Sequence, residues 1–210
     1  TTAVASLTST QLNALNSTNL EALSTGQVAA LTTTQASNLT GAQLNLMQTS
    51  DIAALSTTAA ASLTSTQLNA LSSTNLEALT TTQVAKLTTT QVSNLTSTQL
   101  NLMQTTDVAA LTTTQVASLT GTQLDGLDAT HLGAVSTAQV TGLTSTQLNA
   151  LSSTNLEALT TTQVAKLTTT QVSNLSSTQL NLMQTSDVAA LSTTAVASLT
   201  STQLNALNST

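Results

Sequence analysis

An apolar residue recurs at every eighth position of this 210-residue chain, and this spacing restricts the possible folds more than any other feature. The register runs from Leu7 to Leu207, and 22 of its 26 residues are Leu. The four exceptions are Met47, Met103, Val135 and Met183. A second apolar register lies three residues before each of these positions, so the unit is [TS]-[TS]-T-Q-[LV]-x-x-L. The sequence predicts one continuous array of about 26 octads over residues 1–210.

A longer repeat lies above the octad. Residues 8–63, 64–119 and 144–199 are near-copies of a seven-octad block, and residues 120–143 add three further octads between the second and third copies. Because the inserted segment is a whole number of octads, the pattern is typical of a solenoid, in which each unit contacts mainly its neighbours. Neither end departs from the octad pattern, so we expect these residues to be a section of a longer array.

The octad spacing favours a chain of short helices. In one continuous α-helix, eight residues turn through about 800°, so an apolar stripe would drift about 80° per repeat. In one strand the two apolar registers would face opposite sides. In a short helix, by contrast, Thr8 caps the start, Gln11 reaches back to form a capping box, and Leu12 and Leu15 share a face.

We therefore predict an all-α solenoid of short capped helices with an eight-residue repeat. The alternative is a β-solenoid, which the β-propensity of Thr and Val favours. Few Gly, no Pro and many Leu, Ala and Gln residues favour the helices. The predicted capping pairs are Thr8 with Gln11, Thr64 with Gln67 and Asp128 with His131. The predicted core includes Leu7, Leu12, Leu15, Leu71, Leu79, Met47, Met103 and Met183.

Composition argues against several classes of protein. The chain has no aromatic residue and no Cys, and it carries two Lys against eight acids for a net charge of −6. Two lysines cannot form a phosphate-binding surface, so we expect no nucleic-acid partner. No apolar run approaches the roughly 20 residues of a membrane span. One His without Cys leaves little for catalysis, so we expect no enzymatic activity and no cofactor.

Few residues qualify as a metal site. Asp125, Asp128 and His131 are spaced by three and could converge on a metal if they shared a helix face. The octad frame gives a simpler interpretation, in which Asp128 is an N-cap and His131 stands in the Gln register. We therefore predict a capping pair and no metal.

The remaining unusual residues recur once per block. Asp51, Asp107 and Asp187 occupy the Gln register, where we expect an acid to favour the helix dipole. The methionines are expected to pack in the core. Exposed charges are expected to pair weakly, if at all, between turns; these are Glu21, Glu77, Glu157, Lys86 and Lys166.

Runs such as Leu-Thr-Thr-Thr-Gln-Val-Ala-Lys-Leu at 79–87 resemble the low-complexity octapeptide arrays of very large, adhesin-like bacterial surface proteins. The resemblance extends over the whole chain. It implies an extracellular, secreted or cell-surface repeat region of a bacterial protein.

These observations predict a structural protein. A single octad buries too little apolar surface to offset the entropy of ordering eight residues, so stability must come from stacked repeats or from packing against other copies. We expect an extracellular fibre or a cell-surface stalk whose partner is the chain itself. The alternative is a binding module that contacts glycan, a neighbouring cell or ice through its Thr-rich surface.

Overall fold

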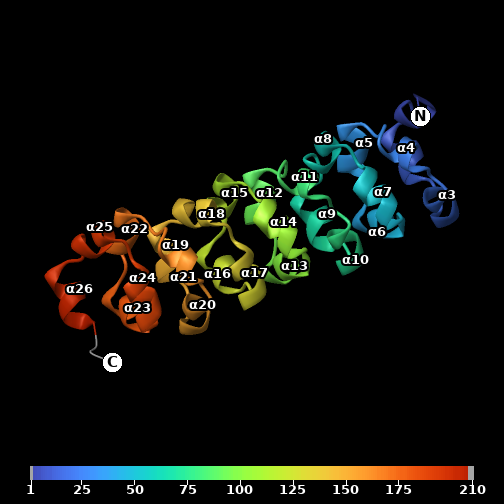
Figure 1. Ribbon diagram of the computed structural model, residues 1–210. Coiled ribbons are helices and arrows are strands. Elements are labelled where there is room, and N and C mark those ends of the chain that lie inside the picture. The colour runs from blue at the N-terminus through green and yellow to red at the C-terminus, as the bar shows by residue number, and fades with distance from the viewer. Residues whose placement is uncertain (1, 208–210) are drawn as a thin grey trace. The chain divides into compact units, whose positions relative to one another are not determined.

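A computed structural model describes residues 2–207, and all regular secondary structure in that range is helical. Each octad forms one helix of four to six residues (Figure 1). The predicted all-α solenoid of short helices is confirmed, and the alternative β-solenoid is wrong for the residues described. Contacts divide the helices into two compact units, Thr1–Leu111 and Thr112–Thr210.

The first unit contains α1 (Thr2–Ala5), α2 (Ser9–Asn13), α3 (Ser17–Glu21), α4 (Thr25–Val28), α5 (Thr33–Asn38), α6 (Gly41–Leu46), α7 (Thr49–Ala54), α8 (Thr57–Ala60), α9 (Ser65–Ala70), α10 (Ser73–Glu77), α11 (Thr81–Val84), α12 (Thr89–Ser93), α13 (Ser97–Leu102) and α14 (Thr105–Ala110). The second contains α15 (Thr113–Ser118), α16 (Gly121–Asp125), α17 (Ala129–Ala134), α18 (Thr137–Gly142), α19 (Ser145–Asn149), α20 (Ser153–Glu157), α21 (Thr161–Val164), α22 (Thr169–Ser173), α23 (Ser177–Leu182), α24 (Thr185–Ala190), α25 (Thr193–Ala197) and α26 (Ser201–Ala206).

Each helix begins after a capping residue in extended conformation. At α9, Thr64 has φ −74° and ψ 155°, and its hydroxyl accepts the backbone N–H of Gln67 at 3.1 Å. The Gln67 side chain returns the interaction, because its Oε1 accepts the Thr64 N–H at 2.6 Å. These two bonds satisfy N–H groups that have no partner inside the helix, so a helix of six residues can start without a longer nucleus.

The Leu register ends many of the helices. Leu71 follows α9 with φ −62° and ψ 138°, and its N–H donates to Leu68 O at 3.3 Å. No residue in the described range has a positive φ. Because the C-cap residues have extended or right-handed helical backbone, the chain does not need the left-handed Gly that commonly follows a helix. This explains how so many helices form with only six Gly in the sequence.

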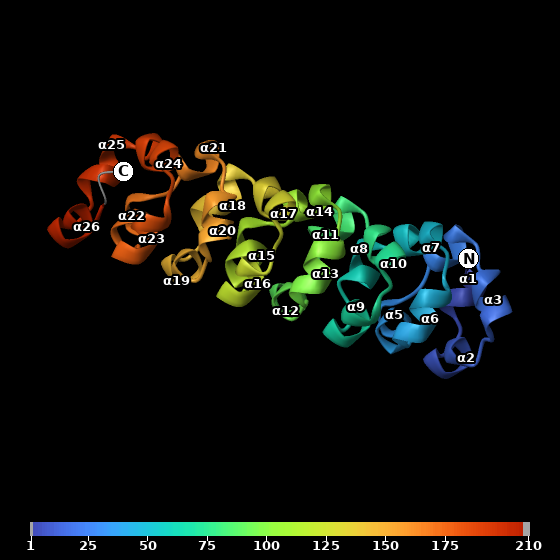
Figure 2. The same cartoon turned by 90° about the horizontal axis from the view of Figure 1, so that it is seen from below.

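Within each unit, one turn of the solenoid contains about three and a half octads. Helices three places apart pack side by side, such as α4 and α7 (Figure 1) or α15 and α18 (Figure 2). Hydrogen bonds between turns join residues 25 to 31 positions apart, with many at 28. Two turns therefore take about 56 residues, which is the length of the seven-octad block.

The two apolar registers face opposite neighbours. In the first octads, Leu12 and Leu20 are fully buried although the described residues include no earlier turn to cover them. In the last octads the same register is open, with Val196 38% and Leu204 47% exposed. The Val/Leu register is therefore covered by the following turn, and the Leu register by the preceding turn. Each turn presents one apolar row to each neighbour, which makes the stack directional.

This arrangement corrects two predicted core positions. Leu7 and Leu15 are only half-buried, because they belong to the register that a preceding turn covers and no turn precedes them in the described range. The other predicted core residues are buried: Leu12, Leu71, Leu79, Met47, Met103 and Met183.

Candidate functional site: the turn-to-turn interface

Buried glutamine side chains connect successive turns. Gln83 is 1% exposed, and its Oε1 accepts the Thr80 N–H at 2.7 Å. Its Nε2 donates to Leu55 O at 2.7 Å and to Ile52 O at 2.9 Å, 28 and 31 residues earlier. One amide therefore caps its own helix and binds the end of a helix one turn before it.

The same pair of spacings recurs in both units. Glutamines that donate to carbonyls 28 and 31 residues earlier include Gln35, Gln67, Gln83, Gln91, Gln147, Gln163, Gln171, Gln179 and Gln203. The acceptors 31 residues earlier lie in the last turn of a helix, and the acceptors 28 residues earlier belong to the apolar residue that follows that helix. A buried carbonyl left unpaired would cost about 1–3 kcal/mol. A neutral amide suits this position because it carries both an acceptor and two donors.

Two of the predicted capping pairs form reciprocal hydrogen bonds. Gln11 N donates to Thr8 Oγ1 at 3.2 Å and Thr8 N donates to Gln11 Oε1 at 2.9 Å, and Thr64 with Gln67 is arranged in the same way. The sequence pattern identified this local half of the Gln role. It did not reveal the second half, the donation from Nε2 to the preceding turn.

Asparagines form a second set of bridges, which sequence reasoning missed. Asn69 Nδ2 donates to Asn94 O at 2.7 Å, and its Oδ1 accepts the Thr96 N–H at 3.1 Å. Asn45 and Asn149 bridge to the following turn at the same spacings of 25 and 27 residues. The signal in the sequence is the recurrent triplet Gln-Leu-Asn. Its third residue is repeatedly Asn, although a position that only faced solvent could hold many residue types.

At two of the places where Gln follows Met, called Met-Gln steps here, the capping residues have exchanged their usual roles. Gln104 stands at the N-cap of α14, and its Nε2 donates to Glu77 O, 27 residues earlier, at 3.1 Å. Gln48 donates to Glu21 O in the same way at 3.5 Å. At these steps the N-cap residue, instead of the third helical residue, carries the amide that crosses to the preceding turn. This exchange gives a physical reason for Gln in a register otherwise filled by Thr, Ser, Asn and Asp.

The third helical residue at the same steps is a buried acid. Asp51 Oδ2 accepts the Gln48 N–H at 3.3 Å, and Asp107 Oδ2 is buried without a hydrogen-bond partner. Burial raises the pKa of Asp107 to about 6, although the Gln104 backbone N–H opposes the change. Burial also raises the pKa of Asp51 and of Asp187. The three acids stand in the first turn of their helices, as expected, but the loss of water affects their pKa more than the backbone hydrogen bond from the N-cap residue does.

Asp128 and His131 form a local cap on α17. The Asp128 carboxylate accepts the His131 backbone N–H at 2.9 Å, and its Oδ1 lies 2.8 Å from the His131 ring Nδ1. The backbone hydrogen bond, with the side-chain bond second, lowers the pKa of Asp128. Asp125 contacts the following turn instead, where its Oδ1 accepts the Ser152 N–H at 2.6 Å. No group of three potential metal ligands occurs among residues 2–207.

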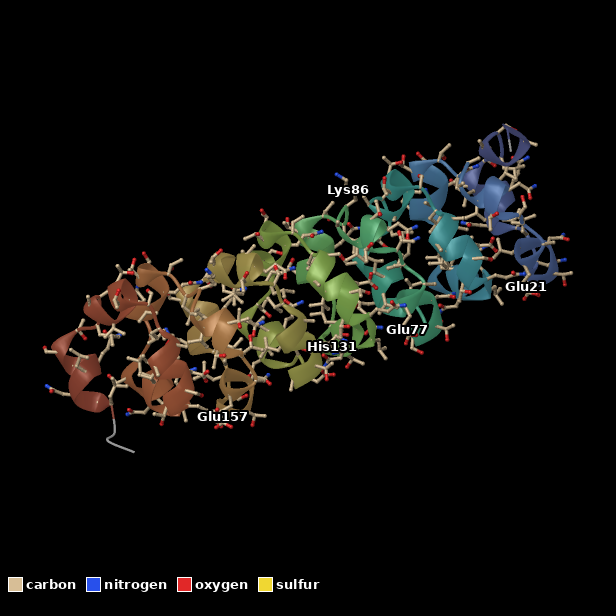
Figure 3. The ribbon with its side chains drawn as sticks, viewed as in Figure 1. Glu21, Glu77, Lys86, His131 and Glu157 are labelled. Carbon is tan, nitrogen blue, oxygen red and sulfur yellow. The ribbon has the colours of Figure 1, made fainter. Side chains whose placement is uncertain are left out.

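The scattered charges lie on the surface (Figure 3). Glu21, Glu77 and Lys86 are exposed, and in the first unit Lys86 lies on the side away from both glutamates. Glu157 and Lys166 are exposed in the second unit. The exposed positions expected for these charges are confirmed, and among the described residues the ion pair is that of Asp128 with His131, not of Glu with Lys. None of the helices described has the length and apolar character needed to cross a bilayer.

The fold and its interface define a class of protein, an α-solenoid built from octads that are joined by side-chain amides. A family profile described as the ALTTAQ repeat matches residues 4–41, 42–81 and 180–210, about half of the chain. The chain belongs to the ALTTAQ repeat family. No curated protein matches it.

Proposed function

We propose that the chain is a structural protein that serves as an extracellular fibre or as a cell-surface stalk. The observation that carries this proposal is the bond from Gln Nε2 to carbonyls 28 and 31 residues earlier, which recurs in both units. A contact that each turn makes with the next in the same way has no natural limit of length. Such a design suits a protein whose role is to extend.

The apolar rows support the same proposal. The row that faces forward and the row that faces backward differ, so one turn is complementary to the next, and their contact is directional. Repetition of one directional contact generates an open, extended array when each unit stacks on the one before without closing a ring. Association of chains with one another, through further stacking or side by side, is therefore the partner interaction that we propose.

The location is proposed from the resemblance to arrays of bacterial surface proteins. The absence of Cys from the sequence is compatible with an oxidising extracellular environment. We place the protein outside the cell or on its surface, in bacteria, and we assign it no enzymatic activity and no cofactor. Its hydroxyls have structural uses at the helix starts, as where Thr80 Oγ1 accepts the Gln83 N–H at 3.2 Å.

Electron microscopy of the purified chain tests the proposal. We expect filaments or extended rods whose axial repeat corresponds to turns of about 28 residues. Filaments would support the fibre, and dispersed rods the stalk. A variant with Gln83→Ala and Gln163→Ala should lose order, whereas Thr82→Ala with Thr162→Ala, at exposed positions of the same helices, should not. Compact globular particles would contradict the structural proposal.

A second candidate is a surface binding module, because the helix starts display hydroxyls, such as those of Thr81 and Thr82, to solvent. Contact with glycan or a neighbouring cell would use this surface. Ice binding needs evenly spaced Thr rows, but 28 is not a multiple of eight. Ser62 therefore follows Thr33 across the turns, with its Oγ bonded to Thr33 O at 3.0 Å. Thermal hysteresis or saturable glycan binding, reduced by Thr81→Ala and Thr82→Ala, would favour the binding module.

A further inference from the structure

We propose that Asp51, Asp107 and Asp187 make the stacking of turns sensitive to pH, because burial between stacked turns favours the neutral carboxyl group and separation of the turns favours the carboxylate. The inference rests on the turn-to-turn interface alone. It would hold whether the array is a fibre, a stalk or a binding module.

The first observation is the position of the three acids. They occupy the register in which Gln elsewhere donates Nε2 to the preceding turn, and they are 2%, 2% and 3% exposed. An ionised carboxylate has acceptors and no donor, so it cannot replace the amide. A protonated carboxyl group has an O–H and presents the same combination of one acceptor and one donor.

The second observation is an atom without a partner. Asp107 Oδ2 is buried and accepts no hydrogen bond. The Gln104 backbone N–H bonds to the same carboxyl group, but one hydrogen bond does not satisfy a buried charge, and proteins usually avoid that cost by neutralising the group. Protonation of Asp107 removes the charge without any change in the fold.

The charged groups near Asp51 and Asp107 do not offset the cost of burying a negative charge there. Asp51 lies in α7, which packs on α4 and α10; Glu77 ends α10, and α4 has no charged residue. Asp107 lies in α14, which packs on α11, and the exposed Lys86 follows α11. Among the residues that the structure describes, no cation is within ion-pair distance of either acid.

The surroundings of Asp187 are equivalent. It lies in α24, which packs on α21, and the exposed Lys166 follows α21. Glu157 ends α20, the helix before α21, and is also exposed. Neither residue forms an ion pair with Asp187 in the described part of the chain.

The direction of the pH effect follows from burial. The pKa of each of the three acids is raised above 3.8, for Asp107 to about 6. A raised pKa in the folded state means that the folded state binds the proton more tightly than the unfolded state. The contribution to stacking is complete below about pH 4 and is lost as the pH rises through about 6 at Asp107. Separation of the turns at Asp107 should be about a hundredfold more favourable at pH 7 than at pH 4.

Carboxyl-selective ¹³C NMR of the full chain tests the proposal directly. The chain has five Asp residues, and single Asp→Asn variants assign the resonances. We expect Asp107 to titrate near pH 6, Asp51 and Asp187 above 3.8, and Asp128 below 3.8. A midpoint at or below 3.8 for Asp107 would overturn the proposal, and this measurement on the parent chain does not depend on the folding of any variant.

Unfolding measurements provide the second test. The triple variant Asp51→Asn, Asp107→Asn and Asp187→Asn should resist urea better than the parent at pH 7 and equally at pH 4. The control is Asp128→Asn, which removes an acid with a lowered pKa and should weaken the protein at pH 7 more than at pH 4. A parent and triple variant with the same pH dependence between 4 and 7 would contradict the proposed switch.

Discussion

Gln83 Nε2 lies 2.7 Å from the carbonyl oxygen of Leu55, 28 residues earlier in the chain. The amide that makes this bond also caps its own helix through Oε1. Local helix formation and long-range stacking therefore depend on the same side chain, which explains why the array needs so few residue types.

Gln83→Ala should lower the free energy of unfolding by about 2–3 kcal/mol, because both the cap and two bonds to the preceding turn are lost. Gln11→Ala is a matched control. Gln11 caps α2 with Thr8, and in residues 2–207 no preceding turn lies beside it. Its loss should cost only about 0.5–1 kcal/mol. Urea unfolding followed by circular dichroism measures both, and equal losses would show that the bonds between turns contribute nothing.

Leu68→Ala should cost about 2–5 kcal/mol, because Leu68 is fully buried between turns and the substitution leaves a cavity. The control is Leu46→Ala, since Leu46 is 40% exposed. Its replacement should change the free energy of unfolding by less than about 1 kcal/mol. The same unfolding assay compares them, and a large loss at Leu46 would contradict the assignment of the apolar rows.

Two glycines should respond in opposite directions to substitution by Ala. A Cβ at Gly41 would meet the Ala70 Cβ at 2.5 Å, so Gly41→Ala should destabilise by about 1–3 kcal/mol despite its better helix propensity. Gly133, inside α17, has open space around it, so Gly133→Ala should stabilise by about 0.5–1 kcal/mol.

The double variant Gly41→Ala with Ala70→Gly checks the cause, since it returns the space that the new methyl group needs. Thermal unfolding of the parent, Gly41→Ala, Gly133→Ala and the double variant gives the comparison. If the double variant is no more stable than Gly41→Ala, close contact between the two residues is not the reason for the loss.

Deletion of residues 72–79, one whole octad, should preserve helix content and cooperative unfolding. Every residue downstream keeps its octad position, so the Gln and Leu registers still meet their partners. Deletion of 76–79 removes half an octad and should abolish cooperative unfolding in the first unit. Circular dichroism and hydrogen exchange distinguish the outcomes, and equal tolerance of both deletions would contradict the register.

The sequence predicts the helices because their determinants are local. Thr64 and Gln67 are three residues apart and form a capping box without any help from the rest of the chain. The position of Gln104 marked its step as unusual, but its partner Glu77 could not be inferred, since the bond depends on the turn length. Leu15 has the same local pattern as Leu71, yet it is only half-buried, because burial requires a neighbouring turn.

A turn of three and a half octads has a consequence for how such a protein can change its length. Glu21 and Glu77 are 56 residues apart and lie on the same side of the first unit (Figure 3). Recombination between neighbouring copies of the block adds or removes two complete turns, so the pattern of side chains presented on each side continues in phase. A gene built from these blocks can therefore yield longer or shorter products that present the same surface.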